Sequence, residues 1–162
     1  MPYTSREFTE RKSLQRIEGY DYTQNGAYFV TICAKKRDEL FGRIHDGMMC
    51  CSETGEVVLE CIKQIEVIYP SVLLKASVVM PNHVHLLLLF LDHPNNPSLL
   101  EMIKQLKMAV SRKLKFSPWQ ERYHHRVIFT TSEFRAVQRY VETNAEKWQE
   151  DCYREERLSA DS

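Results

Sequence analysis

The stretch MPNHVHLLLLF, residues 80–90, constrains the fold of this chain more than any other segment. It places two histidines, His83 and His85, at the start of an apolar run that continues to Leu91. Alternate residues of a strand share a face, so both imidazoles would lie side by side. Beyond the histidines both faces are apolar, which indicates a central strand covered on each side. The sequence therefore predicts a sheet packed on both faces, with two imidazoles at the N-terminal end of one inner strand.

The remaining elements fit one arrangement around that strand. Aromatic and β-branched residues predict further strands at 27–34, 72–80 and 121–129, and a small hairpin at 41–55. Helical spacing predicts helices at 55–69, at 98–117 with Ser98 and Glu101 as a capping box, and at 130–151 with Thr131 or Ser132 as the cap. This order predicts an α+β, ferredoxin-like (split βαβ) antiparallel sheet with helices on one face and an additional C-terminal helix. The free face of the sheet is one place where that last helix could pack.

Length and composition predict one domain with two polar ends. A chain of 162 residues fits a basic arm at 1–16, a single domain at 17–151 and an acidic tail at 152–162. No apolar run approaches the length of a membrane helix and no apolar signal segment opens the chain, so we expect a cytoplasmic protein that does not enter a membrane. The five cysteines show no Cys-x-x-Cys spacing, which favours free thiols.

The formal net charge of zero hides two basic regions. The arm carries four cations, Arg6, Arg11, Lys12 and Arg16. The helix at 98–117 carries five, Lys104, Lys107, Arg112, Lys113 and Lys115, against Glu101 alone. A neutral total therefore does not exclude a local surface for a polyanion. The alternative is that these residues form ordinary solvated faces.

Two neutral imidazoles on one strand face can hold one divalent ion and leave coordination positions open for a substrate. The alternative is that His83 and His85 are merely polar residues at a strand end. The last helix adds a second clue, because Tyr140, Asn144 and Lys147 follow one flank of its apolar stripe. A tyrosine there can rest its ring on the sheet while its hydroxyl reaches a polar site, although such a residue is more commonly an amphipathic filler.

Three motifs together closely resemble the REP-associated tyrosine transposases, a branch of the single-tyrosine HUH transposases. They are GYDYTQNGAYFVTICAKKRDELFG, MPNHVHLLL and RYVETNAEKW, and the resemblance runs from about Arg11 to Asp151. HUH denotes two histidines around a bulky apolar residue, here His83, Val84 and His85. The resemblance implies that these histidines and Asn144 bind Mg²⁺ or Mn²⁺, and that Tyr140 attacks single-stranded DNA.

The resemblance further implies a metal-dependent single-stranded DNA endonuclease and strand transferase that cleaves near hairpin DNA through a 5′-phosphotyrosine intermediate. Its partner would be single-stranded or hairpin DNA, and the protein would act as a monomer or a homodimer. The residues expected to contact DNA are Arg6, Arg11, Lys12, Arg16, Lys104, Lys107, Arg112, Lys115 and Lys147.

The chain departs from the family pattern in the strand at 121–129. Arg126 and Phe129 stand where family members commonly have a histidine and an arginine. These substitutions favour one alternative function, a non-catalytic module that keeps the fold and binds hairpin DNA or RNA without cutting it.

Overall fold

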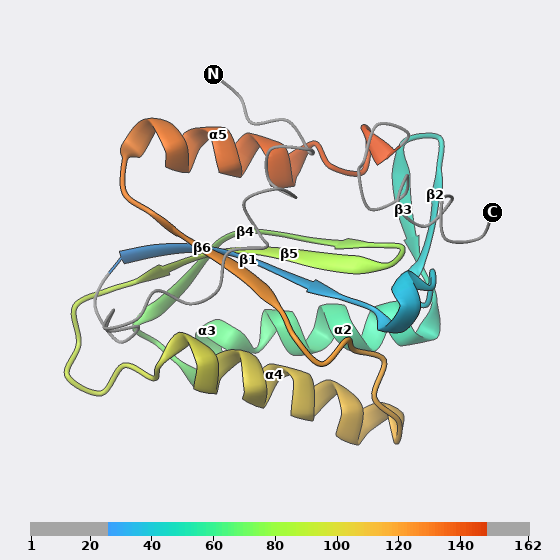
Figure 1. The fold of residues 1–162 in the computed structure, drawn as a ribbon, viewed down its shortest axis with the longest axis horizontal. Coiled ribbons are helices and arrows are strands. Elements are labelled where there is room, and N and C mark those ends of the chain that lie inside the picture. The colour runs from blue at the N-terminus through green and yellow to red at the C-terminus, as the bar shows by residue number, and fades with distance from the viewer. Residues whose placement is uncertain (1–25, 149–162) are drawn as a thin grey trace.

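The computed structural model describes residues 26–148, in which a four-stranded antiparallel sheet lies between two layers of helix (Figure 1). The strand order is β4-β5-β1-β6, and the two inner strands are β5 and β1. The strand bounds are β1 (Gly26–Cys33), β4 (Val72–Met80), β5 (His83–Phe90) and β6 (His124–Ile128). The prediction that the histidine strand is central is therefore confirmed.

The helices divide between the two faces of the sheet (Figure 1). One face is covered by α2 (Glu53–Lys63), α3 (Ile65–Ile68) and α4 (Leu99–Leu114), and the opposite face by α5 (Thr131–Glu142). The predicted hairpin is present as β2 (Gly42–His45) and β3 (Met48–Cys51), and a short 3-10 turn, η1 (Lys35–Arg37), follows β1. The split βαβ fold with a surplus helix on the free face is confirmed.

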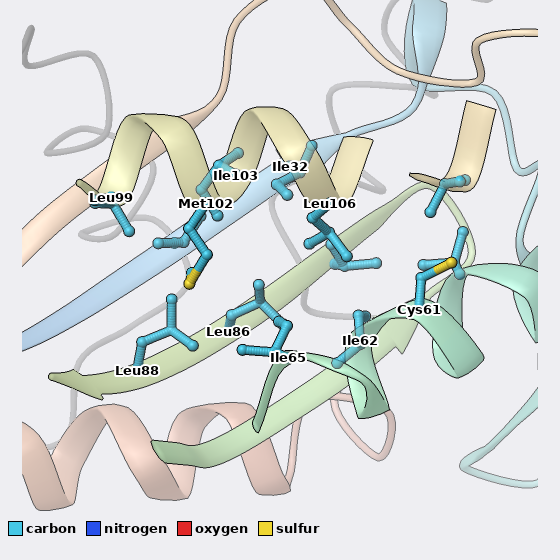
Figure 2. Packing of buried hydrophobic residues seen from close by; sticks show 14 of the residues in the cluster. Ile32, Cys61, Ile62, Ile65, Leu86, Leu88, Leu99, Met102, Ile103 and Leu106 are labelled. Atoms are coloured by element: carbon cyan, nitrogen blue, oxygen red, sulfur yellow. The ribbon is translucent and has the colours of Figure 1, made fainter. Parts of the chain in front are cut away.

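Alternation along β5 gives each face its own core. Leu86 and Leu88 point toward α4, where Figure 2 shows them beside Met102 and Ile103. Leu87 points the other way, into a smaller cluster beneath α5 that includes Phe29, Ile128, Val137, Tyr140 and Val141. Because the cluster under α5 contains far fewer buried residues, less apolar burial holds this helix to the sheet than holds the layer of α2, α3 and α4 on the other face.

Several predicted helix boundaries were wrong by one or more residues, including the end of α4, which is Leu114 instead of residue 117. The first helix begins at Glu53, because Ser52 caps it by accepting from the N–H of Gly55, and it breaks at Gln64. The cap of α5 is Thr130, whose extended backbone lets its hydroxyl accept from the N–H of Glu133. The predicted Ser98 cap of α4 is confirmed, since its Oγ accepts from the N–H of Glu101.

The largest difference is at the end of α5, which stops at Glu142 instead of continuing toward residue 151. Thr143 is β-branched and Asn144 competes for backbone hydrogen bonds, so both are weak helix formers. The backbone forms a turn from Thr143 to Lys147. That turn brings Trp148 back onto the sheet, where it is buried.

The predicted arm (1–16) and tail (152–162) lie outside the described residues. Within residues 26–148, no helix has the length and apolar character needed to cross a membrane. The cysteines of this part of the chain are free thiols, as predicted: Cys33, Cys50, Cys51 and Cys61.

The two-sided core gives a matched test at neighbouring positions. Leu86→Ala and Leu87→Ala each remove a fully buried side chain, so each should lower the free energy of unfolding by about 2–5 kcal/mol. Only Leu87→Ala removes contacts beneath α5, and it should therefore raise amide hydrogen exchange in α5 selectively. Equal acceleration of α5 exchange in both variants would contradict this division of the core.

Candidate active site

The pairing of β5 with β1 places both histidines on the face that α5 covers. His85 pairs with Thr31 and His83 with Cys33, so all four side chains share one face. The two imidazoles turn their Nε2 atoms toward each other at 3.1 Å, with ring centroids 4.5 Å apart. The structure therefore brings the two predicted residues together in one compact pair.

A hydrogen bond on the far side of each ring fixes its orientation. His83 Nδ1 lies 2.7 Å from Asn82 Oδ1, and the amide nitrogen of Asn82 donates to the carbonyl of Arg37. This second bond sets which way the amide points, so its oxygen faces the imidazole and Nδ1 of His83 must donate. His85 Nδ1 lies 2.8 Å from the hydroxyl of Thr31, which can donate or accept. In neutral His83 the proton is thus on Nδ1, and Nε2 presents a lone pair to the other ring.

The side chains of this site are buried. The buried polar side chains of the described residues are few, and all of them belong to this region: Thr31, Asn82, His83, His85 and Asn144. Buried polar groups are costly unless they are hydrogen-bonded, so a cluster of this kind needs a reason in packing or in function.

Tyr140 enters the site from α5. Its ring centroid lies 5.4 Å from that of His85 and 6.1 Å from that of Phe29, and the side chain is only 8% exposed. Phe29 also stacks on His85 at 5.2 Å, so the three rings form one cluster in which each contacts the other two. The predicted proximity of Tyr140 to the histidine pair is present in the fold.

Asn144 is almost fully buried, but it does not belong to the helix as predicted. It lies in the turn after α5, between Tyr140, whose ring meets His85, and Trp148, whose ring stacks on His83 at 6.2 Å. The segment that carries Asn144 therefore passes over the histidine pair. Lys147, in the same turn, is exposed.

Three positioning residues were missed by sequence reasoning. Asn82 directly precedes the histidine motif, so adjacency was an available signal for its role. Thr31 gave no signal, because its contact with His85 depends on the register of two strands 54 residues apart. Trp148 is a large apolar residue, but its stacking on His83 depends on the turn that ends α5.

The basic residues predicted to contact DNA divide into three groups. Lys104, Lys107, Arg112 and Lys115 line one groove beside α4. Lys147 is exposed in the turn after α5. Lys113, which is not among the predicted contacts, forms an ion pair with Glu60 across α2 and α4 at 3.1 Å. The predicted contacts of the arm, Arg6, Arg11, Lys12 and Arg16, lie outside the described residues.

Arg126 and Phe129, the two residues that depart from the family pattern, lie in different environments. Arg126 is on the same sheet face as Phe29 and pairs with Glu133 in the first turn of α5, both side chains being largely buried. Its guanidinium therefore ties β6 to α5. Phe129 follows β6 and is 73% exposed.

Comparison with known proteins supports the fold. No family model matches the chain. An uncharacterised protein of Haemophilus influenzae is 25% identical over 165 residues, covering 87% of this chain and 91% of that protein. A REP-associated tyrosine transposase solved with a REP hairpin superposes with a TM-score of 0.64 at 19% identity, covering 83% of this chain and 74% of the other.

The chain has the fold of a REP-associated tyrosine transposase. A protein of Deinococcus radiodurans described as a candidate transposase also superposes, with a TM-score of 0.50 at 20% identity, covering 80% of this chain and 96% of that one. The resemblance that the sequence motifs indicated is thus confirmed at the level of the transposase fold.

The hydrogen-bond pattern predicts opposite tautomers for two neutral histidines. His83 should carry its proton on Nδ1, because Asn82 accepts there. His93 should carry its proton on Nε2, because its Nδ1 accepts from the N–H of Asn95. Nitrogen-15 shifts of the imidazoles distinguish the two forms at a pH where both rings are neutral. Finding His83 with its proton on Nε2 would show that Asn82 does not set its orientation.

Proposed function

We propose that this chain is a member of the REP-associated tyrosine transposase family and acts as a metal-dependent single-stranded DNA endonuclease and strand transferase. The observation that carries the proposal is the meeting of three groups on one sheet face. The Nε2 atoms of His83 and His85 are 3.1 Å apart, and the ring of Tyr140 lies against His85.

The side chains at this point fit a divalent ion. Two nitrogens bound to one ion at about 2.1 Å and at roughly a right angle lie about 3.0 Å apart. The separation of His83 Nε2 and His85 Nε2 is close to that value. Within residues 26–148 no cluster of three or more His, Cys, Asp or Glu side chains could hold a metal, so a third protein ligand would have to be another residue. The buried amide of Asn144 would supply that oxygen.

The ion would be Mg²⁺ or Mn²⁺. Both suit phosphate oxygens, and two nitrogen ligands shift the preference toward Mn²⁺. When bound, such an ion supplies positive charge that polarises a phosphodiester. Asn82 and Thr31 would hold the two imidazoles with their Nε2 atoms facing the ion.

Tyr140 would be the nucleophile. Its phenolic oxygen would form a bond to phosphorus as the bond from phosphorus to the 3′-oxygen breaks. The phenol loses its proton, the leaving 3′-oxygen gains one, and the products are a 5′-phosphotyrosine and a free 3′-hydroxyl. The tyrosyl ester keeps the phosphodiester energy, so a second 3′-hydroxyl can attack it and release Tyr140. Cleavage followed by such rejoining is strand transfer.

The substrate we propose is single-stranded DNA beside a hairpin. A protein of the same fold was solved bound to a REP hairpin. The cations that would contact the phosphates are those named from the sequence: Arg6, Arg11, Lys12, Arg16, Lys104, Lys107, Arg112, Lys115 and Lys147.

The proposal predicts a covalent adduct that depends on one hydroxyl. Incubation with a labelled hairpin oligonucleotide and Mn²⁺ should give a protein–DNA band that survives denaturation, and Tyr140→Phe should abolish it while keeping the ring contacts with His85 and Phe29. Hairpin binding by Tyr140→Phe should be retained. Binding without any adduct in the wild-type protein would favour the non-catalytic module instead.

A second prediction concerns the residues that hydrogen-bond to the Nδ1 atoms of the two imidazoles. Asn82→Ala removes the acceptor that orients His83, and loss of such a partner commonly lowers metal affinity about 10- to 100-fold. Calorimetric titration with Mn²⁺ measures the change. Asn96→Ala is a matched control, because Asn96 hydrogen-bonds Ser71 and Leu91 elsewhere in the fold. Equal Mn²⁺ affinity in wild type and Asn82→Ala would contradict the proposed metal site.

A further inference from the structure

A groove of about 860 Å³ runs beside α4 and is closed on one side by the chain from Phe116 to Tyr123. We call it the α4 groove. Its volume lies within the range of ligand pockets, roughly 300–1,000 Å³. The residues that matter here are Lys104, Met108, Arg112, Lys115, Phe116 and Trp119.

The α4 groove combines apolar and cationic surface. Phe116 is 50% exposed and Met108 is 42% exposed, so an aromatic ring and a thioether face solvent side by side with lysine and arginine. Its lining holds four cations, Lys104, Lys107, Arg112 and Lys115, against two carboxylates, Glu101 and Glu121. The groove is thus basic, although the whole chain is neutral. Exposed aromatics among cations suit nucleic acid, in which flat bases alternate with charged phosphates.

Two features hold the α4 groove in shape. Lys107 Nζ donates to the carbonyls of Gln120 and Glu121 at 2.8 and 3.1 Å, and burial lowers the pKa of its amine. Lys107 therefore fastens the segment from Phe116 to Tyr123 to α4. At the end of α4, Lys115 adopts a left-handed conformation with φ 66° and ψ 18°, a position that usually holds glycine. This turn directs the chain so that Phe116 lines the groove.

The wall of the α4 groove is hydrogen-bonded to the strand end that carries the candidate active site. Trp119 bridges to Ala34, and the N–H of Gln120 donates to the carbonyl of Cys33 at 2.9 Å. Cys33 in turn pairs with His83 across β1 and β5. The groove lies on the face of the sheet that α4 covers and the histidine pair on the face that α5 covers, so a nucleic acid strand held in the groove would pass around this strand end to reach the pair.

We propose that the α4 groove binds an unpaired stretch of the DNA that adjoins the hairpin, with a base stacked on Phe116 and phosphates neutralised by Lys104, Arg112 and Lys115. This inference rests on the proposed function and adds where the single strand is held. A polyanion fits better than an apolar protein segment, because an apolar partner would strip water from the cations without neutralising them. The indole N–H of Trp119, which is buried without a hydrogen-bond partner in residues 26–148, offers a donor to an acceptor that reaches it.

The test separates base stacking from phosphate attraction. The full-length chain is titrated by fluorescence anisotropy with one DNA hairpin that carries a single-stranded extension of about ten thymidines, within the site size of many single-strand binders. A second probe has the same hairpin with the thymidines replaced by abasic sugar-phosphates. The two probes have equal charge, so their difference in affinity reports the bases alone.

The wild-type protein should bind the thymidine probe about tenfold more tightly than the abasic probe. Phe116→Ala should abolish that difference, whereas Phe116→Trp should preserve it. Phe129→Ala is the matched control, because it removes another exposed phenylalanine that does not line the groove. Lys104→Ala should weaken both probes equally and reduce the salt dependence of binding. Circular dichroism and thermal melting verify that each variant is folded.

Three results would overturn the inference. One is an unchanged difference between the probes in Phe116→Ala, and another is tighter binding of a uridine RNA extension than of the thymidine DNA extension. The third is that the protein forms a dimer in the absence of DNA and that Phe116→Ala dissociates this dimer. In that case the groove would be an interface between copies of the chain. If a Tyr140-dependent adduct still forms in any of these cases, the groove assignment alone fails. If the protein neither binds hairpin DNA nor forms the adduct, the proposed function fails.

Discussion

The contact between His83 Nε2 and His85 Nε2 is the interaction on which the rest of the site depends. Two buried imidazole nitrogens 3.1 Å apart require a proton or a cation between them. The fold enforces this approach from behind, through Asn82 on one ring and Thr31 on the other. The same arrangement explains why the N-terminal end of β5 is polar while the rest of the strand is apolar. A site built on a central strand is also rigid, which suits a reaction that needs fixed geometry.

The second constraint is the attachment of α5. Within residues 26–148 no strand follows this helix, and it packs on the sheet through a small apolar cluster that includes Tyr140. The proposed nucleophile is therefore also part of the contact that positions its helix. Beyond the helix, the turn at residues 143–147 returns Trp148 to His83, so the chain meets the histidine pair at two points. The buried ion pair of Arg126 with Glu133 fastens the other end of α5.

The sequence predicted those features that depend on local periodicity. A period of two was sufficient to place His83 and His85 on one face, and a period of 3.6 was sufficient to bring Tyr140 to the sheet. It failed where distant segments meet or where a helix stops. The partnership of Thr31 with His85 depends on strand register, and Asn144 reaches the site from a turn that helical spacing does not describe. The hydrogen bonds of Lys107 with the carbonyls of Gln120 and Glu121 could not be predicted either, because a helical wheel shows only the neighbours on the same helix.

The most direct test of the central claim is the position of a bound ion. A crystal of the full-length protein grown with Mn²⁺ and measured for anomalous scattering would locate it without assumptions about catalysis. We expect one strong peak within coordination distance of both His83 Nε2 and His85 Nε2, on the side of the sheet that α5 covers. A peak elsewhere with the two imidazoles unligated, or none at a saturating Mn²⁺ concentration, would contradict it.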